Sequence, residues 1–430
     1  MLSSLNVLKV KVCQSAIRRN LADLSMEGEA ITRMGHTSRS VMVIASWALI
    51  QLIVAVSCLP TGAHSNGSSS DGLVQNEWTT ETVDTEENSG TSLTLALDSK
   101  GSPGIAYCRW RSGEEAYELK FAWRETDGWR TEAVDGEGDV GYQCSLAFDA
   151  NDKPAIAYLD RTHGRLKFAR RGETGWSFQT VDSVPSVFET SLKRDRKGVL
   201  FVSYITDEPL VLDEPHELKL ARLVDEEWKI EVVTTEGQPM GKASLAFDAS
   251  NDPLLVYYLG QIDALTVARK KDGAWRFSAL PSCEGLGWPS LATDPWGNPG
   301  IAFATGSPHW DIIYAEWEGD DWNIATIPQT KAAGCSMHLS FDLNGEPCVS
   351  YVVIVRPLKE DALTLAVRTG ESWKTEVIDR GPYVGGYNSL AISNEGVVMI
   401  AYSYPDLEGL AAGRPGSAIS GVKFAWRQLD

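Results

Sequence analysis

Short segments of alternating apolar and polar residues run along most of this 430-residue chain, and the pattern recurs about every 50 residues. Each repeat holds four such segments, rich in β-branched and aromatic residues and bounded by turn residues, as is typical of β-strands. The fourth segment opens with a tryptophan in every repeat: Trp78, Trp129, Trp176, Trp228, Trp275, Trp322 and Trp373. Repeats of this length predict a propeller, a solenoid or another array.

The connections between the segments are equally regular. The first segment of each repeat ends in a short polar residue: Asp98, Asp149, Asp195, Asp248, Asp294, Asp342 or Ser393. Gly, Asn or Asp follows, as in Asp98-Ser-Lys-Gly101, and a proline usually starts the second segment. Asp accepts backbone N–H bonds and Gly adopts positive φ, so a tight turn is expected. Four strands joined by tight turns predict an antiparallel propeller blade.

The two ends of the repeat region complement each other. The first tryptophan segment, Trp78–Asp84, precedes any first strand, whereas the last repeat stops after its third strand. We expect the N-terminal segment to supply the missing outer strand and so leave no open blade. The sequence therefore predicts an all-β fold, a seven-bladed β-propeller of four-stranded antiparallel blades, closed by an N-terminal strand that completes the last blade.

The chain before the repeats differs in kind. Val41–Val56 is an almost wholly apolar run, with Arg33 and Arg39 before it and small residues up to Ser65 after it. A basic flank, an apolar core and a small-residue exit are typical of an export signal. Cys58 offers an alternative, since a lipoprotein signal places its lipidated cysteine there. We expect an exported protein that is periplasmic, at the cell surface or secreted.

These features predict the domain organisation. The expected parts are a prefix at 1–33 that a start at Met34 would leave untranslated, a signal peptide at 34–65, a linker at 66–75 and the propeller at 76–430. No membrane span is expected in the mature chain.

The net charge limits the partners that we expect, and the cysteine content limits the disulfides and metal sites. The net charge is −19, which argues against nucleic acid or an anionic membrane as partner because both need positive potential. The cysteines after the signal occupy no repeated position, so no periodic disulfide framework is predicted, although the strand order brings Cys108 and Cys144 close enough to pair. Metal-ligand spacings are absent from the sequence, and we expect no metal and no cofactor.

Function is expected on the face that carries the variable loops, because sites sit on variable loops held by a rigid scaffold. The links between second and third strands and between blades vary, whereas the other turns are stereotyped. Unusual side chains gather on that face and around its central funnel: Tyr142, Phe188, Glu189, Lys242, Trp288, His309, Trp310, His338 and Tyr387. Aromatic rings with polar groups between them suit sugar or peptide binding. Ordinary loop packing is the alternative for each of them.

Residues that recur in every repeat have the opposite interpretation. The tryptophans, the turn aspartates and the third-strand arginines are expected to build the scaffold. A hydrolase with paired carboxylates is the catalytic alternative, and Glu189, Asp160 and Asp207 are its candidates.

The cassette SLAFDxxxxPxIAYxD…LKFAxR…GW resembles those of exported bacterial seven-bladed β-propeller repeat proteins, which are mostly uncharacterised and loosely sialidase-like (BNR-like). The resemblance covers about residues 76–430 and implies the fold, with no catalytic residues carried over. The leading hypothesis is an exported non-catalytic β-propeller, a monomer, that binds a glycan or an extracellular protein through its variable loop face. The alternatives are a glycoside-active enzyme, such as a sialidase-like hydrolase with carboxylates in the funnel, and a structural or assembly module.

Overall fold

The computed structural model describes residues 78–206, 216–280, 288–305, 311–319, 321–328, 333–354, 360–405 and 421–429, with only the backbone at 333–335. The predicted prefix, signal peptide and linker lie outside these residues. Within the described ranges, no helix is long and apolar enough to cross a membrane.

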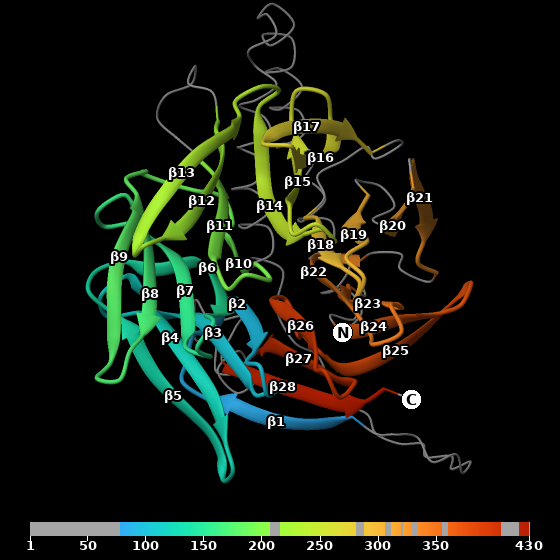
Figure 1. The fold of residues 1–430 in the computed structure, drawn as a ribbon. Helices are drawn as coiled ribbons and strands as arrows, with labels where there is room; N and C mark the ends of the chain where they lie inside the picture. Colours follow the sequence, from blue (N-terminus) through green and yellow to red (C-terminus); the bar gives the residue numbers. More distant parts are fainter. Residues whose placement is uncertain are drawn as a thin grey trace, which may run out of the picture. The chain divides into compact units, whose positions relative to one another are not determined.

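The described residues form 28 strands in seven four-stranded antiparallel sheets, which are the blades of a β-propeller ring (Figure 1). From inner to outer strand, blade 1 is β2–β5 (Ser89–Leu97, Pro103–Arg111, Ala116–Glu125, Gly128–Asp135), blade 2 is β6–β9 (Val140–Phe148, Pro154–Asp160, Arg165–Arg171, Trp176–Asp182) and blade 3 is β10–β13 (Ser191–Arg194, Leu200–Ile205, Leu218–Val224, Glu227–Thr234). Blade 4 is β14–β17 (Pro239–Phe247, Pro253–Leu259, Ala264–Lys271, Ala274–Ala279), blade 5 is β18–β21 (Ser290–Thr293, Pro299–Ala304, Ile312–Glu318, Asp321–Thr326) and blade 6 is β22–β25 (Ala333–Phe341, Pro347–Val353, Asp361–Thr369, Ser372–Gly381). The predicted all-β, seven-bladed architecture is therefore confirmed.

Blade 7 combines strands from both ends of the repeat region. Its order from inside to outside is β26 (Asn388–Ile392), β27 (Val397–Tyr404), β28 (Gly421–Gln428) and β1 (Thr79–Asp84). β1 runs antiparallel to β28, with Thr79 opposite Trp426 and Asp84 opposite Val422.

The turn between the inner and second strands has the predicted construction. In blade 1 the Asp98 carbonyl oxygen accepts a hydrogen bond from Gly101 N at 3.1 Å, and Asp98 Oδ1 accepts from Lys100 N at 2.9 Å and Ser102 N at 2.7 Å. Gly101 has a φ of 80°, which favours glycine. Ser393 replaces the aspartate in blade 7, where its Oγ accepts from Val397 N at 3.1 Å. The local sequence alone thus fixes this turn.

The core lies between neighbouring blades. The second strands carry fully buried aromatic residues around the ring: Tyr107, Tyr158, Tyr204, Tyr257, Phe303, Tyr351 and Tyr402. Farther out, four of the repeated tryptophans, Trp129, Trp176, Trp228 and Trp373, pack edge-on against a third-strand ring of the preceding blade. Trp129 lies 5.0 Å from Phe424 and Trp228 lies 5.1 Å from Phe168, measured between ring centroids. These contacts support the predicted scaffold role of the tryptophans.

Third-strand arginines link adjacent outer strands. At the junction of blades 7 and 1, Arg124 donates to Glu81 at 2.6 Å and Trp129 Nε1 donates to the same carboxylate at 2.8 Å. The hydrogen bond from Arg124 holds the pKa of Glu81 below its ordinary value, because it outweighs the effect of burial. Glu132, Arg171 and Trp176 repeat this arrangement between blades 1 and 2. We call this arrangement the outer clamp.

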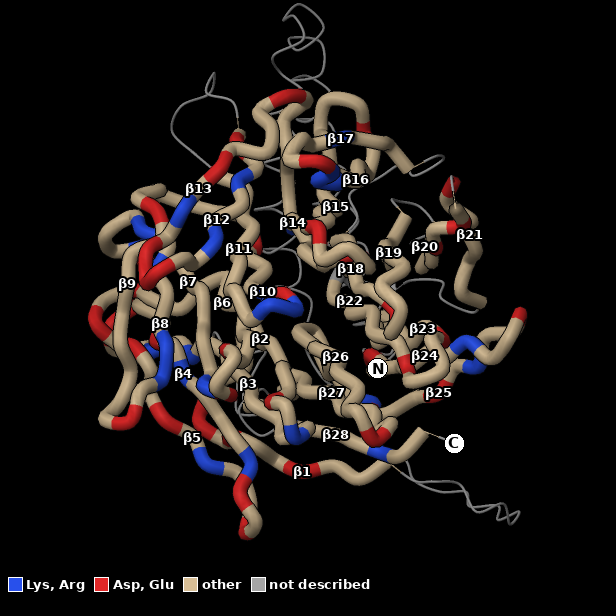
Figure 2. The backbone as a smooth tube through the Cα atoms, viewed as in Figure 1, with Lys and Arg blue, Asp and Glu red and all other residues tan. Residues whose placement is uncertain are grey.

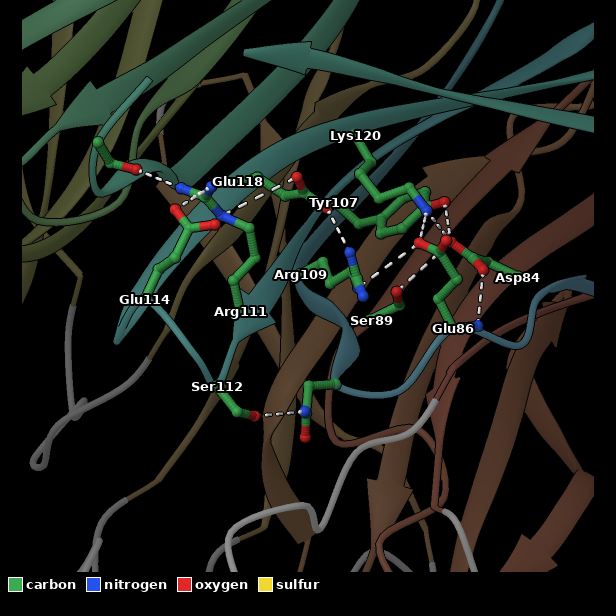
Figure 3. Close-up of polar contacts among 12 residues, drawn as sticks. Asp84, Glu86, Ser89, Tyr107, Arg109, Arg111, Ser112, Glu114, Glu118 and Lys120 are labelled. Atoms are coloured by element: carbon green, nitrogen blue, oxygen red, sulfur yellow. Dashed lines mark hydrogen bonds and ion pairs between the residues drawn. The ribbon is translucent and has the colours of Figure 1, made fainter. Parts of the chain in front are cut away.

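A second inter-blade link was not predicted. The last residue of one blade's outer strand, Asp84, accepts hydrogen bonds from two residues of the next blade, Tyr107 Oη at 2.6 Å and Lys120 Nζ at 2.7 Å. Figure 3 shows these side chains pointing toward one another, with Glu86 and Arg109 beside them. The same triad recurs at three further junctions, buried or partly buried, as Asp135–Tyr158–Lys167, Asp182–Tyr204–Lys219 and Asp379–Tyr402–Lys423.

At the other three junctions the sequence has neither the aspartate nor the lysine of the triad. Thr234, Pro281 and Pro328 stand where the aspartate would be, and Thr266, Ile313 and Thr364 stand where the lysine would be. A buried charge without its partner is costly, so each junction carries both members or neither.

We expect stability to fall in acid through these triads. Burial alone would raise the pKa of Asp135, but hydrogen bonds from Lys167, Tyr158 and the Glu137 backbone outweigh it and hold the pKa below its ordinary value. Asp84 is lowered in the same way by Lys120 and Tyr107. A depressed carboxyl pKa stabilises the fold above the unfolded value of about 3.9, and this stability is lost as pH falls through the folded pKa. Thermal unfolding between pH 6 and 3 would measure this loss, and an unchanged melting temperature below pH 4 would contradict it.

Candidate functional site: the inner rim

The inner rim comprises the seven inner strands and the residues directly before them. Inner strands are edge strands whose unpaired N–H groups need acceptors. Serines four residues before the turn residue supply them to the next blade around the ring. Ser145 Oγ accepts from Leu192 N at 3.0 Å, and Ser290 Oγ accepts from Leu339 N at 2.9 Å. Ser191, Ser244 and Ser389 do the same. We call these five serines the collar of the inner rim. Inner-strand residues that differ from the pattern are candidates for a function.

Two of the exceptions are basic, and a third basic residue, Lys242, lies near both. His338 takes the serine position in β22, and Lys193 in β10 stands where the other blades carry alanine or serine. Enclosure by the surrounding strands, together with the charges of Lys242 and Lys193, holds the pKa of His338 well below its ordinary value. Enclosure and the charge of Lys242 also lower the pKa of Lys193. Figure 2 shows basic residues on inner strand β10. The rim therefore concentrates positive charge within a protein of net charge −19.

An acidic and aromatic group adjoins these bases. Glu189 lies beside Lys242, with 3.5 Å between Oε2 and Nζ. Burial raises the pKa of Tyr387 far above its ordinary value, and nearby Tyr142, Tyr117 and Glu189 add to this effect. The Tyr142 ring lies 5.5 Å from that of Tyr117. Tyr142 and Tyr387, which both lie near Glu189, therefore remain protonated at neutral pH and can donate hydrogen bonds.

The structure thus brings five of the predicted residues to one region: Tyr142, Glu189, Lys242, His338 and Tyr387. Sequence reasoning missed Lys193, which lies within the repeated SLKRD segment of blade 3. The signal was available, since aligning the seven copies shows it to be the only large residue at its position.

The remaining predicted residues lie elsewhere. Phe188 packs edge-on against His216 at 5.6 Å and joins the core between blades 3 and 4, so its ring serves packing. Trp288 is half-buried directly before β18. His309, Trp310 and Asp207 lie outside the described residues.

The carboxylate of Asp160 is engaged within its own blade. Its side chain is 3% exposed and accepts hydrogen bonds from His163 N at 3.0 Å and from the His163 ring at 2.9 Å. This pattern closes the turn between β7 and β8. Asp160 therefore gives no support to the paired-carboxylate hypothesis.

The suggested pairing of Cys108 with Cys144 is wrong, since both thiols are free. Cys108 Sγ donates to the Gly141 carbonyl and Cys144 Sγ donates to the Ser92 carbonyl, each at 2.7 Å. The two thiols nonetheless lie close to each other. Burial raises the pKa of Cys108, and the nearby Cys144 raises it further. Among the described residues, no group of three or more His, Cys, Asp or Glu is arranged to hold a metal ion.

We expect His338 to stay neutral at pH 6.5, where a free imidazole is half protonated. The causes are its enclosure and the two nearby lysine charges. NMR titration of the imidazole would measure this. Lys193→Ala should raise the His338 pKa because it removes one of those charges, whereas the same titration curve in both proteins would show that the lysine is too far away to matter.

Comparisons with known proteins bear on the fold. No family model and no curated protein matches the sequence. An ulvan lyase described as a new polysaccharide lyase family, PL25, has a similar structure, with a TM-score of 0.51 and 12% identity over 80% of this chain and 95% of that one. A protein of unknown function from Dyadobacter fermentans gives a TM-score of 0.48 and 12% identity over 82% of this chain and 98% of that one.

A third similar structure is the intramolecular trans-sialidase from Ruminococcus gnavus, with a TM-score of 0.46 and 12% identity over 80% of this chain and 96% of that one. At such identities the likeness concerns the fold alone. The protein is a seven-bladed propeller, which is the fold that the resemblance of its repeats implies.

Proposed function

We propose that this protein is an exported, non-catalytic β-propeller that binds an acidic glycan through the inner rim, on the face of the variable loops. The basic cluster of Lys193, Lys242 and His338 carries the proposal. Lys193 and His338 replace a small residue and a serine of the other blades, and Glu189 forms an ion pair with Lys242. The charges of Lys193 and Lys242 lie near each other, which is unfavourable, so an anion between them would be bound favourably.

The neighbouring tyrosines favour a sugar as the carrier of that anion. Tyr142 and Tyr387 offer flat rings together with hydroxyl donors, which suits contact with a sugar face. The Arg161 guanidinium lies 5.6 Å from the centre of the Tyr142 ring and pairs with Asp139 at 3.3 Å, so it adds little net charge at this side of the rim.

The overall charge limits the size of the ligand. A protein of net charge −19 repels long polyanions at a distance, whereas charges inside the rim act mainly at close range. We therefore expect a short oligosaccharide with one or two acid groups.

A glycan array with acidic oligosaccharides and their neutral counterparts, read with the full chain, tests the proposal. Selective capture of the acidic members, weakened by salt, is the expected result. Equal capture of neutral members would contradict the role of the basic cluster. Turnover of a captured glycan would favour the glycosidase alternative.

A further inference from the structure

The outer clamp is incomplete at the junction between blades 4 and 5. The clamp acid stands three residues after each outer-strand tryptophan. This position holds an acid at four junctions, Glu81, Glu132, Glu231 and Glu376, and the neutral acceptor Gln179 at a fifth. Between blades 4 and 5 this position is Ser278, and the clamp base of the next blade is replaced by Trp317. Serine is too short to reach the tryptophan of blade 5.

A groove of ≈ 160 Å³ marks that junction. Its walls include Val267, Arg269, Arg276 and Ser278 from blade 4 and Trp317 and Trp322 from blade 5. The pairing of β16 with β17 places Val267 opposite Ser278 and Arg269 opposite Arg276, so these four side chains share one face of the blade.

The groove contains a hydrogen-bond donor without an acceptor. Trp322 is 8% exposed, and its Nε1–H has no partner among the described residues. At the equivalent site Trp176 Nε1 donates to Glu132 at 2.8 Å. A buried N–H without an acceptor costs about 1–3 kcal/mol, so an acceptor entering from solvent would be favoured.

In the described part of the chain, Trp78 and Trp275 also have no acceptor at Nε1. Their junctions differ from that of Trp322, because the clamp acid is present and bound to the clamp base. Glu376 pairs with Arg427 at 2.6 Å, and Glu231 pairs with Lys270 at 2.6 Å.

Two arginines in the groove also have no carboxylate. Arg269 and Arg276 are direct cross-strand neighbours, an arrangement that is unfavourable for like charges, and neither forms an ion pair with a described residue. The Arg269 guanidinium stacks on Trp317, 4.7 Å from the ring centre. Ala325 also replaces the clamp acid between blades 5 and 6, but there Glu316 and Glu346 supply Arg368 with carboxylates at 2.7 and 3.1 Å.

We propose that this groove is a second binding site, which takes the carboxylate of a sugar acid in place of the missing clamp glutamate. Trp322 Nε1–H donates to the carboxylate, and Arg269 and Arg276 balance its charge, as Trp129 and Arg124 do for Glu81. The groove is smaller than the roughly 300 Å³ of a pocket for a drug-sized ligand, so it holds a single sugar residue, free or at a chain end. The indole walls provide apolar contact for the sugar ring.

Binding of D-glucuronate to the full chain, followed by NMR of the tryptophan indole N–H signals, tests this proposal, with D-glucose as the neutral probe. We expect glucuronate to shift the signal that Trp322→Phe removes, and Trp322→Phe to weaken binding about tenfold, the factor for one hydrogen bond. An oligosaccharide ending in glucuronate distinguishes a chain end from the free acid. An equal shift with glucose, or a shift with oligo-aspartate and none with glucuronate, would overturn the proposal.

Ser278→Glu gives a test that does not depend on removing a core residue. It restores the clamp acid, so it should block glucuronate while raising the melting temperature by about 1–3 °C. Ser372→Glu adds the same charge to the exposed start of another outer strand and should leave binding unchanged. Undiminished binding by Ser278→Glu would overturn the proposal. Lys193→Ala should leave glucuronate binding in this groove unchanged. A failure of the groove proposal can therefore be told apart from a failure of the inner-rim proposal.

Discussion

Replacing Asp135 by threonine should lower the free energy of unfolding by about 3 kcal/mol, the lower end of the range for breaking a buried ion pair. The Asp135 side chain is 7% exposed and that of Lys167 is 19% exposed, with 2.5 Å between carboxylate and ammonium. The substitution leaves the lysine charge and the Tyr158 hydroxyl without their acceptor. Both would then lack the solvation that the unfolded chain gives them.

The double variant Asp135→Thr, Lys167→Thr should recover most of this loss. It recreates the combination that the chain already uses between blades 3 and 4, where Thr234, Thr266 and Tyr257 occupy the positions of the acid, the base and the tyrosine. We expect it to lie within about 1 kcal/mol of the native protein, because no unpaired charge remains.

Equilibrium denaturation of the native, single and double variants measures these differences. Asp127→Thr is the matched control, since it breaks an exposed pair with Arg130, whose side chains are 65% and 45% exposed. An exposed pair contributes less than about 1 kcal/mol. If the double variant were no more stable than the single one, the coupling between acid and base would be refuted.

Removing the rim lysines should have the largest effect on binding. We expect Lys193→Ala and Lys242→Ala each to weaken capture of an acidic oligosaccharide about tenfold or more, the scale of one charge-assisted hydrogen bond. The double variant should also bind with weaker dependence on salt, because fewer charges act. The free energy of unfolding should not fall for Lys193→Ala, since this change relieves repulsion with Lys242.

Lys229→Ala provides the matched control on an outer strand. Its side chain is 54% exposed and pairs with Glu227 alone, so its loss should leave binding unchanged. Isothermal titration at two salt concentrations distinguishes the variants. Native affinity in the Lys193, Lys242 double variant would remove the inner rim as the site.

Much of the fold could be predicted because the signals are local. Strand period, the Asp-x-x-Gly turn and the repeat spacing all act within one blade, as at Asp98–Gly101. The candidate site was less predictable. Phe188 shares its variable segment with Glu189, yet it packs into the core while Glu189 faces Lys242. Both lie in the link between β9 and β10, where no strand period indicates which side chain faces the neighbouring blade.

The sequence by itself determined the seven blades, their four strands and the turns between inner and second strands, since each depends on residues close together in the chain. The tertiary structure decided what lies between the blades. The Asp135 triad, the basic cluster of the inner rim and the groove beside Ser278 each join residues of different repeats. Whether such residues meet depends on strand register and blade packing, and the free energy of a charge or N–H group depends on the partner and solvent it meets there.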